Sequence, residues 1–414
     1  GPVGLRAAVE NALLGHRVTV CEKRGKFSRV NILTLWQQTT QDLVALGAKY
    51  FYPELRIHGS PLHMGTREIQ LCLLKTSLLL GVRILYETEL LGLRTEADGE
   101  TPWQAVLLPV EPAEEPGTRS SIRKSLDSLK LAALRFKPLK VADYTSTFSC
   151  NWVDDAALDL SFLQVAVPTK GGGFTEPFHV LQVAEGEWSS TCRRLGFRKT
   201  IDKFKQAIGM VVNLDYDSSN PVEKNMRSFT ISYGPGANPI RDSLKEADIL
   251  IENIEYLRGT THYIVVTLSK TTLFSYGVLK SDTAKWSEQL LRAENVDMAS
   301  MQVLARKIAT IIGLPESTKF CDWNPVQLFD FSSRSRAYES VRVISCNKDG
   351  SRPVVLEDAP SKTDGDLPLS ERANNAPVFL LGDTLLEPFW PQGLGSNRGF
   401  HSSVDAAFSS LIFK

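Results

Sequence analysis

The first 22 residues restrict the fold more than any other part of the chain. Gly1 and Gly4 open a helix-forming stretch that ends at Gly15, and an apolar strand at 18–21 then leads to Glu22. Glycines at a helix start let the free NH groups approach a pyrophosphate, and an acid after the next strand accepts hydrogen bonds from ribose hydroxyls. The spacing therefore predicts the later part of a Rossmann βαβ unit.

Two interpretations of these glycines stay open at this point. Glycines at a helix start also serve as plain caps or allow close packing, whereas the spacing to Glu22 favours a nucleotide site. In a Rossmann sheet, the strand before this helix is central and buried on both faces. We therefore expect the natural chain to extend upstream of Gly1 and to supply that strand.

The segment after Glu22 carries side chains suited to the adenosine half of a dinucleotide. Arg24, Arg29 and Asn31 follow the strand closely. The planar guanidinium of arginine pairs well with phosphate, so the two arginines are candidate phosphate ligands. A solvated basic turn is the alternative.

Composition places the chain among soluble globular proteins. Its 414 residues are 43% hydrophobic and 23% charged, enough for a large core and two or more lobes. The 47 basic residues balance 47 acidic ones, so no net field favours nucleic acid or a membrane surface. The six cysteines lack metal-site or disulfide spacing. We expect reduced thiols, a cytoplasmic location, and no metal, nucleic-acid partner or membrane span.

The C-terminal segment GDTLLEPFWPQGLGSNRGF, at 382–400, has the layout of a flavin site. An apolar strand ends in Gly-Asp, and a glycine-rich turn then leads into a helix. Asp383 is a suitable acceptor for ribityl hydroxyls, and backbone NH groups near Gly393 and Gly395 are suited to stabilise negative charge on a reduced flavin. A buried strand and helix whose glycines only permit close packing is the alternative.

The remaining stretches divide the chain into lobes. An amphipathic helix at 67–80, stopped by Gly81, and a strand at 82–90 continue the nucleotide half. The runs IGMVVNLDY, RSFTISYG and HYIVVTLSK predict strands, and 286–312 predicts a helix. We predict an α/β fold, in which a Rossmann-type FAD-binding domain with a truncated first strand adjoins an α+β lobe on the substrate side. The predicted ranges are 1–109, 177–195 and 346–414 for the FAD-binding domain, 110–176 for a divergent insertion, and 196–345 for the lobe over the flavin.

Seven stretches, in order and over most of the chain, resemble the flavin monooxygenase domain of the MICAL proteins, which is similar in fold to aromatic-ring hydroxylases. They are GPVGLR, VCEKRGKFSRVNILTLW, DLVALGAKYFYPEL, REIQLCLLKTSLLLGV, IENIEYLRGTTHYIVVTLSK, FDFSSRSRA and GDTLLEPFWPQGLGSNRGF. The EPFWP string beside Gly-Asp and the THY segment are the most specific of them.

The resemblance implies roles for individual residues. The family contacts FAD at the positions of Glu22, Arg24, Arg29, Asn31, Tyr263 and Asp383. Trp390 falls on the family's tryptophan beside the isoalloxazine ring and is the predicted catalytic residue, with an ordinary core aromatic as the alternative.

The resemblance also implies an activity. A member of this family is an FAD-dependent monooxygenase that uses NADPH and dioxygen to oxidise methionine sulfur of filamentous actin to the sulfoxide, which promotes filament disassembly. It further implies association with the cytoskeleton, and calponin-homology or LIM domains beyond Lys414. Two other functions stay open. One is a different flavin hydroxylase or an NADPH oxidase that produces hydrogen peroxide; the other is a catalytically impaired module that binds actin or another partner.

The sequence departs from the family at four positions near the expected cofactor. The family's GADG-like segment corresponds to FHVLQVAEGEW, with Val183 in place of the first glycine and Glu185 in place of the aspartate. Val30 stands where a second asparagine is usual, and Leu90 where an aromatic is expected. These changes concern catalysis more than fold.

Overall fold

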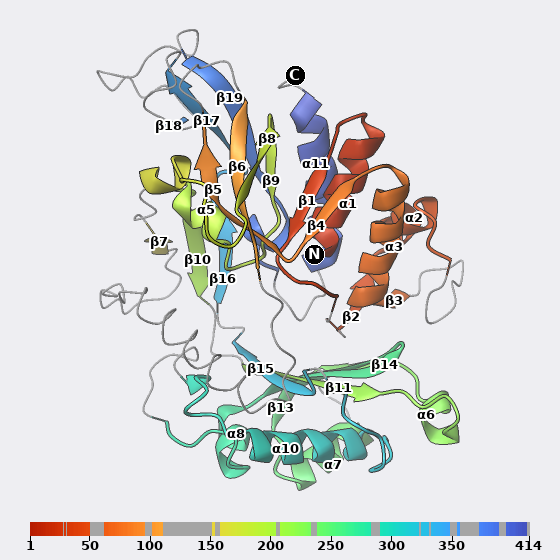
Figure 1. The fold of residues 1–414 in the computed structure, drawn as a ribbon. Coiled ribbons are helices and arrows are strands. Elements are labelled where there is room, and N and C mark those ends of the chain that lie inside the picture. Colours follow the sequence, from red (N-terminus) through yellow and green to blue (C-terminus); the bar gives the residue numbers. More distant parts are fainter. Residues whose placement is uncertain are drawn as a thin grey trace.

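The chain forms two lobes, one above the other in Figure 1. The computed structural model describes residues 1–27, 29, 31–49, 62–95, 102–110, 151–153, 158–203, 208–232, 238–282, 290–322, 324–330, 333–347, 354–356, 372–388 and 395–411. The upper lobe contains both ends of the chain, and the lower lobe is a sheet covered by helices on its outer face. Within the described residues, no helix is both long enough and apolar enough to cross a membrane.

The upper lobe combines short helices with several small sheets. Its elements are α1 (Pro2–Leu13), β1 (Thr19–Glu22), β2 (Ile32–Leu35), α2 (Gln37–Ala45), β3 (Leu62–Gly65), α3 (Thr66–Leu79), β4 (Arg83–Tyr86), β5 (Thr88–Arg94), β6 (Trp103–Pro109), β7 (Asn151–Val153), β8 (Phe174–Phe178), β9 (Leu181–Val183), α5 (Ser190–Arg194), β10 (Lys199–Lys203), β16 (Ser333–Ala337), β17 (Val341–Asn347), β18 (Val354–Leu356), β19 (Arg372–Leu380) and α11 (Gly395–Ser410).

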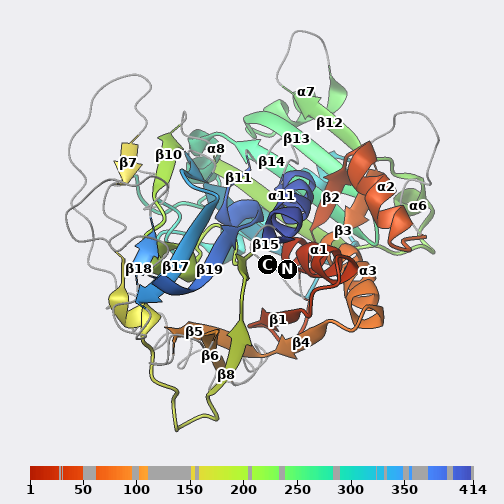
Figure 2. The ribbon, with the colours of Figure 1, turned by 90° about the horizontal axis from the view of Figure 1, so that it is seen from above.

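Two parallel strand pairs give this lobe its Rossmann character. β1 pairs with β4, and β9 pairs with β19. The other strands form sheets in the orders β18-β17-β19-β9, β5-β6-β8, β16-β10-β7 and β2-β3. Helices α1 and α11 lie side by side, as the view from above shows (Figure 2). A Cβ atom at Gly399 would lie 2.4 Å from Cγ2 of Val3, so glycine is what allows the two helices to approach this closely.

The helix predicted at 67–80 is confirmed, but the strand predicted after it is divided. α3 ends before Gly81, whose φ of +78° suits glycine. Glu87 has a φ of +50°, and this left-handed residue turns the chain between β4 and β5, which belong to different sheets. The alternation of apolar residues continues across this turn, and the sequence pattern therefore predicted one strand instead of two.

The lower lobe is a five-stranded antiparallel sheet in the order β12-β13-β14-β11-β15. Its elements are β11 (Ile208–Asp215), α6 (Pro221–Asn225), β12 (Phe229–Ser232), α7 (Pro239–Glu246), β13 (Ile251–Arg258), β14 (Thr261–Leu268), α8 (Lys270–Ser275), α10 (Met298–Ile311) and β15 (Val326–Asp330). The predicted strands are confirmed. The helix predicted at 286–312 is confirmed from Met298 to Ile311 as α10, where the Asp297 side chain caps the first turn by accepting a hydrogen bond from the Ser300 NH at 2.8 Å. Residues 291–297 are not helical, and residues 283–289 lie outside the described part of the chain.

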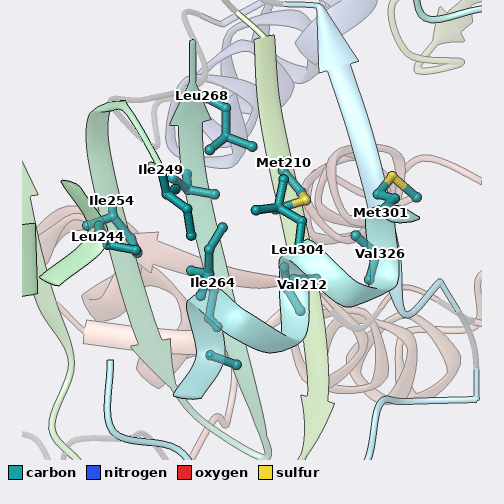
Figure 3. Close-up of a cluster of buried hydrophobic side chains, with 14 of the residues drawn as sticks. Met210, Val212, Leu244, Ile249, Ile254, Ile264, Leu268, Met301, Leu304 and Val326 are labelled. Carbon is teal, nitrogen blue, oxygen red and sulfur yellow. The ribbon is translucent and has the colours of Figure 1, made fainter. Parts of the chain in front are cut away.

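The two faces of this sheet have different neighbours. Helices α7, α8 and α10 cover the face turned away from the upper lobe (Figure 1). Figure 3 shows how Met210, Val212 and Ile264 of the sheet meet Met301 and Leu304 of α10 in a fully buried core. Side chains alternate along each strand, and the residues in between therefore point toward the upper lobe.

Candidate cofactor site

A cavity of about 1740 Å³ is lined by residues of both lobes. On one side are the start of α1, β1, the segment after β9 and the start of α11; on the other are β13 and β14. Nine of the predicted cofactor residues line it: Gly1, Gly4, Glu22, Arg24, Arg29, Asn31, Tyr263, Asp383 and Gly395. The predicted residues Gly393 and Trp390 lie outside the described part of the chain.

Glu22 is held at the beginning of α1. Its Oε2 accepts a hydrogen bond from the Gly1 nitrogen at 2.9 Å, and its Oε1 accepts one from the Arg24 NH at 3.1 Å. Lone pairs of this carboxylate remain available to hydroxyl donors.

Arg24 and Arg29 place two positive charges on the cavity wall. Both side chains are exposed there, and neither forms an ion pair with a described carboxylate. The surrounding protein and then the charge of Arg24 lower the pKa of Arg29, while Asp383 and Glu22 oppose this shift. Two neighbouring cations without ion-pair partners favour an anion at this point, and a pyrophosphate has the matching charge.

Asp383 lies close to the first residue of α11. A Cβ atom at Gly395 would lie 3.5 Å from Oδ1 of Asp383 and 2.9 Å from Cγ of Pro388. Burial raises the pKa of Asp383, and the charge of Arg29 opposes that shift. A carboxylate acceptor and the NH groups of a helix N-terminus thus lie side by side, an arrangement suited to a ligand with both hydroxyl and electronegative edges.

Asn31 and Tyr263 join the two lobes at the cavity. The Asn31 Nδ2 donates to the Tyr263 Oη at 3.4 Å. The Asn31 carbonyl accepts hydrogen bonds from the NH of Thr66 at 2.8 Å and from its hydroxyl at 2.9 Å, which anchors the upper-lobe partner. Burial raises the pKa of Tyr263, so its hydroxyl stays protonated and can donate to a ligand.

Glu185, the residue that replaces the family's aspartate, bonds the first turn of α5, whose N-cap is Ser189. Its Oε2 accepts hydrogen bonds from the Ser189 hydroxyl at 2.7 Å and the Thr191 NH at 3.1 Å, and its Oε1 accepts one from the Thr191 hydroxyl at 2.6 Å. The additional methylene of glutamate thus serves the next helix. The turn itself is tied to the Gly-Asp strand end, because the Thr384 hydroxyl bonds both the NH and the carbonyl of Gly186 at 3.0 Å.

The segment after this turn contains two residues that sequence reasoning missed. Trp188 lines the cavity with 73% of its surface exposed. Burial, followed by the charges of Glu387 and Asp383, raises the pKa of Glu187 to about 7. Their position directly after the GADG-like segment was the only available signal.

The chain is similar to known proteins in sequence. A family model described as "Mical, Rossman domain" matches residues 222–322, which lie in the lower lobe, not in the lobe with the parallel strand pairs, and include Tyr263. Over 99% of its length the chain is 32% identical to F-actin monooxygenase MICAL1 of Mus musculus, of which it covers 31%. It is 29% identical over 99% of its length to F-actin monooxygenase MICAL2 of Rattus norvegicus, of which it covers 17%. The resemblance to the MICAL proteins that the sequence predicted is thus confirmed. The chain spans less than a third of the length of these curated relatives.

Solved structures of other flavoproteins share the fold of this chain. Aklavinone-11 hydroxylase, in its complex with FAD and aklavinone, matches with a TM-score of 0.52 and 13% identity, over 99% of this chain and 60% of that one. A flavoprotein/dehydrogenase from Cytophaga hutchinsonii matches with a TM-score of 0.53 and 11% identity, over 100% of this chain and 76% of that one. The predicted fold class, a Rossmann-type domain with a second α+β lobe, is confirmed. The domain boundaries and the strand predicted upstream of Gly1 stay predictions.

Proposed function

We propose that this MICAL-type domain binds FAD in the inter-lobe cavity and acts as an NADPH-dependent monooxygenase. The observation that carries the proposal is the convergence of nine predicted contact residues, from segments far apart in sequence, on one cavity of about 1740 Å³. When bound, FAD supplies the redox and oxygen chemistry, whereas the protein supplies binding, orientation and electrostatics.

Residues of different charge on the cavity wall bind different parts of FAD. Arg24 and Arg29 hold the pyrophosphate, and Glu22 accepts hydrogen bonds from ribose hydroxyls. Asp383 accepts from the ribityl chain, and the NH groups at the start of α11, around Gly395, stabilise negative charge at the pyrimidine edge of the flavin.

For the substrate we propose methionine side chains of filamentous actin, which are converted to the sulfoxide. The support is the identity of about a third to proteins named F-actin monooxygenases. The family resemblance adds Trp390 as the catalytic residue beside the flavin ring, a cytoplasmic and cytoskeleton-associated location, and calponin-homology or LIM domains in the full-length protein.

FAD binding is tested by titrating the purified chain with FAD and following flavin fluorescence. We expect a yellow protein and saturable binding at one site. An Arg24→Ala/Arg29→Ala double variant should bind far more weakly while keeping the far-UV circular dichroism of the unmodified chain. A folded protein with the predicted upstream strand restored that does not take up FAD would refute the cofactor assignment and leave a partner-binding module as the function.

The substrate is tested by NADPH consumption with and without filamentous actin, followed by mass analysis of actin methionines. We expect actin to stimulate consumption and to acquire sulfoxide. Consumption without stimulation, matched by hydrogen peroxide release, would instead identify an oxidase. A Trp390→Ala variant that retains FAD and normal turnover would remove Trp390 from the catalytic machinery.

A further inference from the structure

A fully buried chain of polar side chains lies on the helix-covered face of the lower sheet. His262 of β14 bonds Tyr256 of β13 through Nδ1, at 2.7 Å, and Glu223 of α6 through Nε2, at 3.1 Å. Their exposed fractions are 0%, 0% and 2%. Burying three ionisable groups costs free energy unless each hydrogen-bonding atom has a partner. The presence of three such groups, all hydrogen-bonded, therefore raises the question of what the network does.

Glu223 is the best-connected member of the group. Its Oε1 accepts a hydrogen bond from the Thr318 hydroxyl at 2.7 Å, and its Oε2 accepts one from the Asp217 NH at 2.7 Å in addition to His262. Burial opposes ionisation, yet these hydrogen bonds lower the pKa of Glu223. The ionised carboxylate therefore ties α6, the Asp217 turn and the Thr318 segment to the beginning of β14.

The contacts assign one protonation state to the imidazole. Burial lowers the pKa of His262 despite the neighbouring Glu223, so the ring is neutral at neutral pH. We assign the proton to Nε2, which donates to Glu223, while Nδ1 accepts from the Tyr256 hydroxyl. In this state all three side chains are satisfied.

The next residue along β14 belongs to the cofactor cavity. Because side chains alternate across a strand, Tyr263 points to the opposite face, where it packs with Ile32 of the upper lobe and reaches Asn31. In the register of the sheet, His262 lies opposite Arg258 and Tyr263 opposite Leu257. Because His262 and Tyr263 are consecutive residues, a displacement of the His262 backbone also displaces Tyr263.

We propose that Glu223, His262 and Tyr256 form a positioning network that fixes the beginning of β14 and thereby holds Tyr263 at the wall of the cofactor cavity. The proposal rests on the proposed function, in that the cavity binds FAD. The three side chains contact neither the cavity nor a ligand, and they act only through the backbone of β14.

Acid should disrupt this network. A proton on Nδ1 of His262 removes the acceptor of the Tyr256 hydroxyl and places a second charge in the core beside Glu223. The other groups that face the ring are the Tyr216 side chain, edge-on at 5.5 Å between centroids, and Arg258, which lies 4.6 Å from the Tyr216 ring and also disfavours protonation. The folded-state pKa of His262 is lowered, so stability is lost as the pH falls below the ordinary histidine value of about 6.5.

The first experiment compares two tyrosine variants in the FAD titration at pH 7.5. Tyr256→Phe keeps the buried ring and removes the hydroxyl that bonds His262; Tyr276→Phe, the matched control in the same lobe, removes a hydroxyl that donates to the Ala247 carbonyl at 2.5 Å. We expect the FAD dissociation constant to rise about tenfold in Tyr256→Phe and to stay within about twofold in the control. Equal constants in the two variants would overturn the proposal.

The second experiment uses the pH profile of FAD binding. Glutamine at position 262 can donate to Glu223 and accept from Tyr256 but does not titrate. His262→Gln should therefore bind FAD at pH 7.5 within about threefold of the unmodified chain and lose the additional decline in affinity that the unmodified chain shows between pH 7 and 5.5. Identical profiles would overturn the proposal. An unmodified chain that binds no FAD at any pH would instead refute the proposed function.

Discussion

The side chains on the two faces of the five-stranded sheet differ in polarity and burial. The face toward α7, α8 and α10 is closed and mainly apolar apart from the network around His262, and residues such as Met210, Ile264 and Leu304 have no exposed surface (Figure 3). The face toward the upper lobe is mixed. Asn253 and Glu255 line the cavity there, and Oδ1 of Asn253 has no hydrogen-bond partner among the described residues.

This difference separates stability from binding within single strands. A closed apolar face contributes dispersion and hydrophobic burial, which act on the folded state as a whole. A wall with incompletely bonded polar groups contributes little to folding and more to ligand recognition. Substitutions on the two faces should therefore affect different measurements, with the network around His262 as the point where the faces are coupled.

The largest expected effect is on the closed face. Leu304→Ala should lower the free energy of unfolding by about 2–5 kcal/mol, because it removes buried methyl groups and leaves a cavity in the core. The FAD dissociation constant of the folded variant should stay within about twofold, since Leu304 lies on the far side of the sheet from the cofactor cavity. Urea denaturation and FAD titration measure the two quantities. A large loss of affinity without loss of stability would contradict the separation of the faces.

The next effect is on the cavity wall. Arg29→Ala should weaken FAD binding by about 2 kcal/mol, which is on the order of thirtyfold, because a charge-assisted hydrogen bond to phosphate is lost. The salt dependence of binding should decrease as well. Arg67→Ala is the control, since Arg67 is exposed on α3 and does not line the cavity. Equal losses in the two variants would indicate a general charge effect.

A smaller effect concerns Glu187, next to the wall. Its pKa of about 7 lies above the ordinary glutamate value because of burial and the charges of Glu387 and Asp383. When the pKa of a carboxyl is higher in the folded than in the unfolded state, the folded protein loses stability as the pH rises between the two pKa values. For Glu187 this range extends from the ordinary glutamate pKa up to about 7. Glu187→Gln should therefore raise the free energy of unfolding by about 1 kcal/mol at pH 8 and by less at pH 5. An equal change at both pH values in urea denaturation would refute this ionisation.

The features that were predictable from sequence are those with local causes. Gly1, Gly4 and Glu22 were identified because a tight helix start and an acid after a strand are local requirements of one βαβ unit. The central strands of the lower lobe were identified because β11 and β14 are short runs of apolar and β-branched residues, which are buried along almost their whole length. Tyr263 was assigned to the cofactor site only by the family resemblance, and its contact with Asn31 of the other lobe was not predicted.

The features that were not predictable depend on single side chains and their neighbours. Nothing in the apolar pattern marks Glu87 as left-handed, and the division between β4 and β5 was therefore missed. The periodicity predicted one helix from 286 on, but residues 291–296 are not helical and Asp297 caps α10 after them. Glu185 resembles an altered cofactor residue in sequence, and only its contacts with Ser189 and Thr191 show that it bonds the first turn of α5.

The smallest expected effect tests the wall at Trp188. A tryptophan with 73% of its surface exposed contributes little to the core, so Trp188→Phe should change the free energy of unfolding by less than about 0.5 kcal/mol. Because the side chain lines the cavity, bound FAD should quench its emission, and the variant should lose part of the FAD-induced quenching shown by the unmodified chain. Trp36→Phe is the control, since Trp36 is partly exposed but does not line the cavity. If both variants retain the full quenching, FAD binds away from Trp188, and the FAD site occupies only part of the cavity.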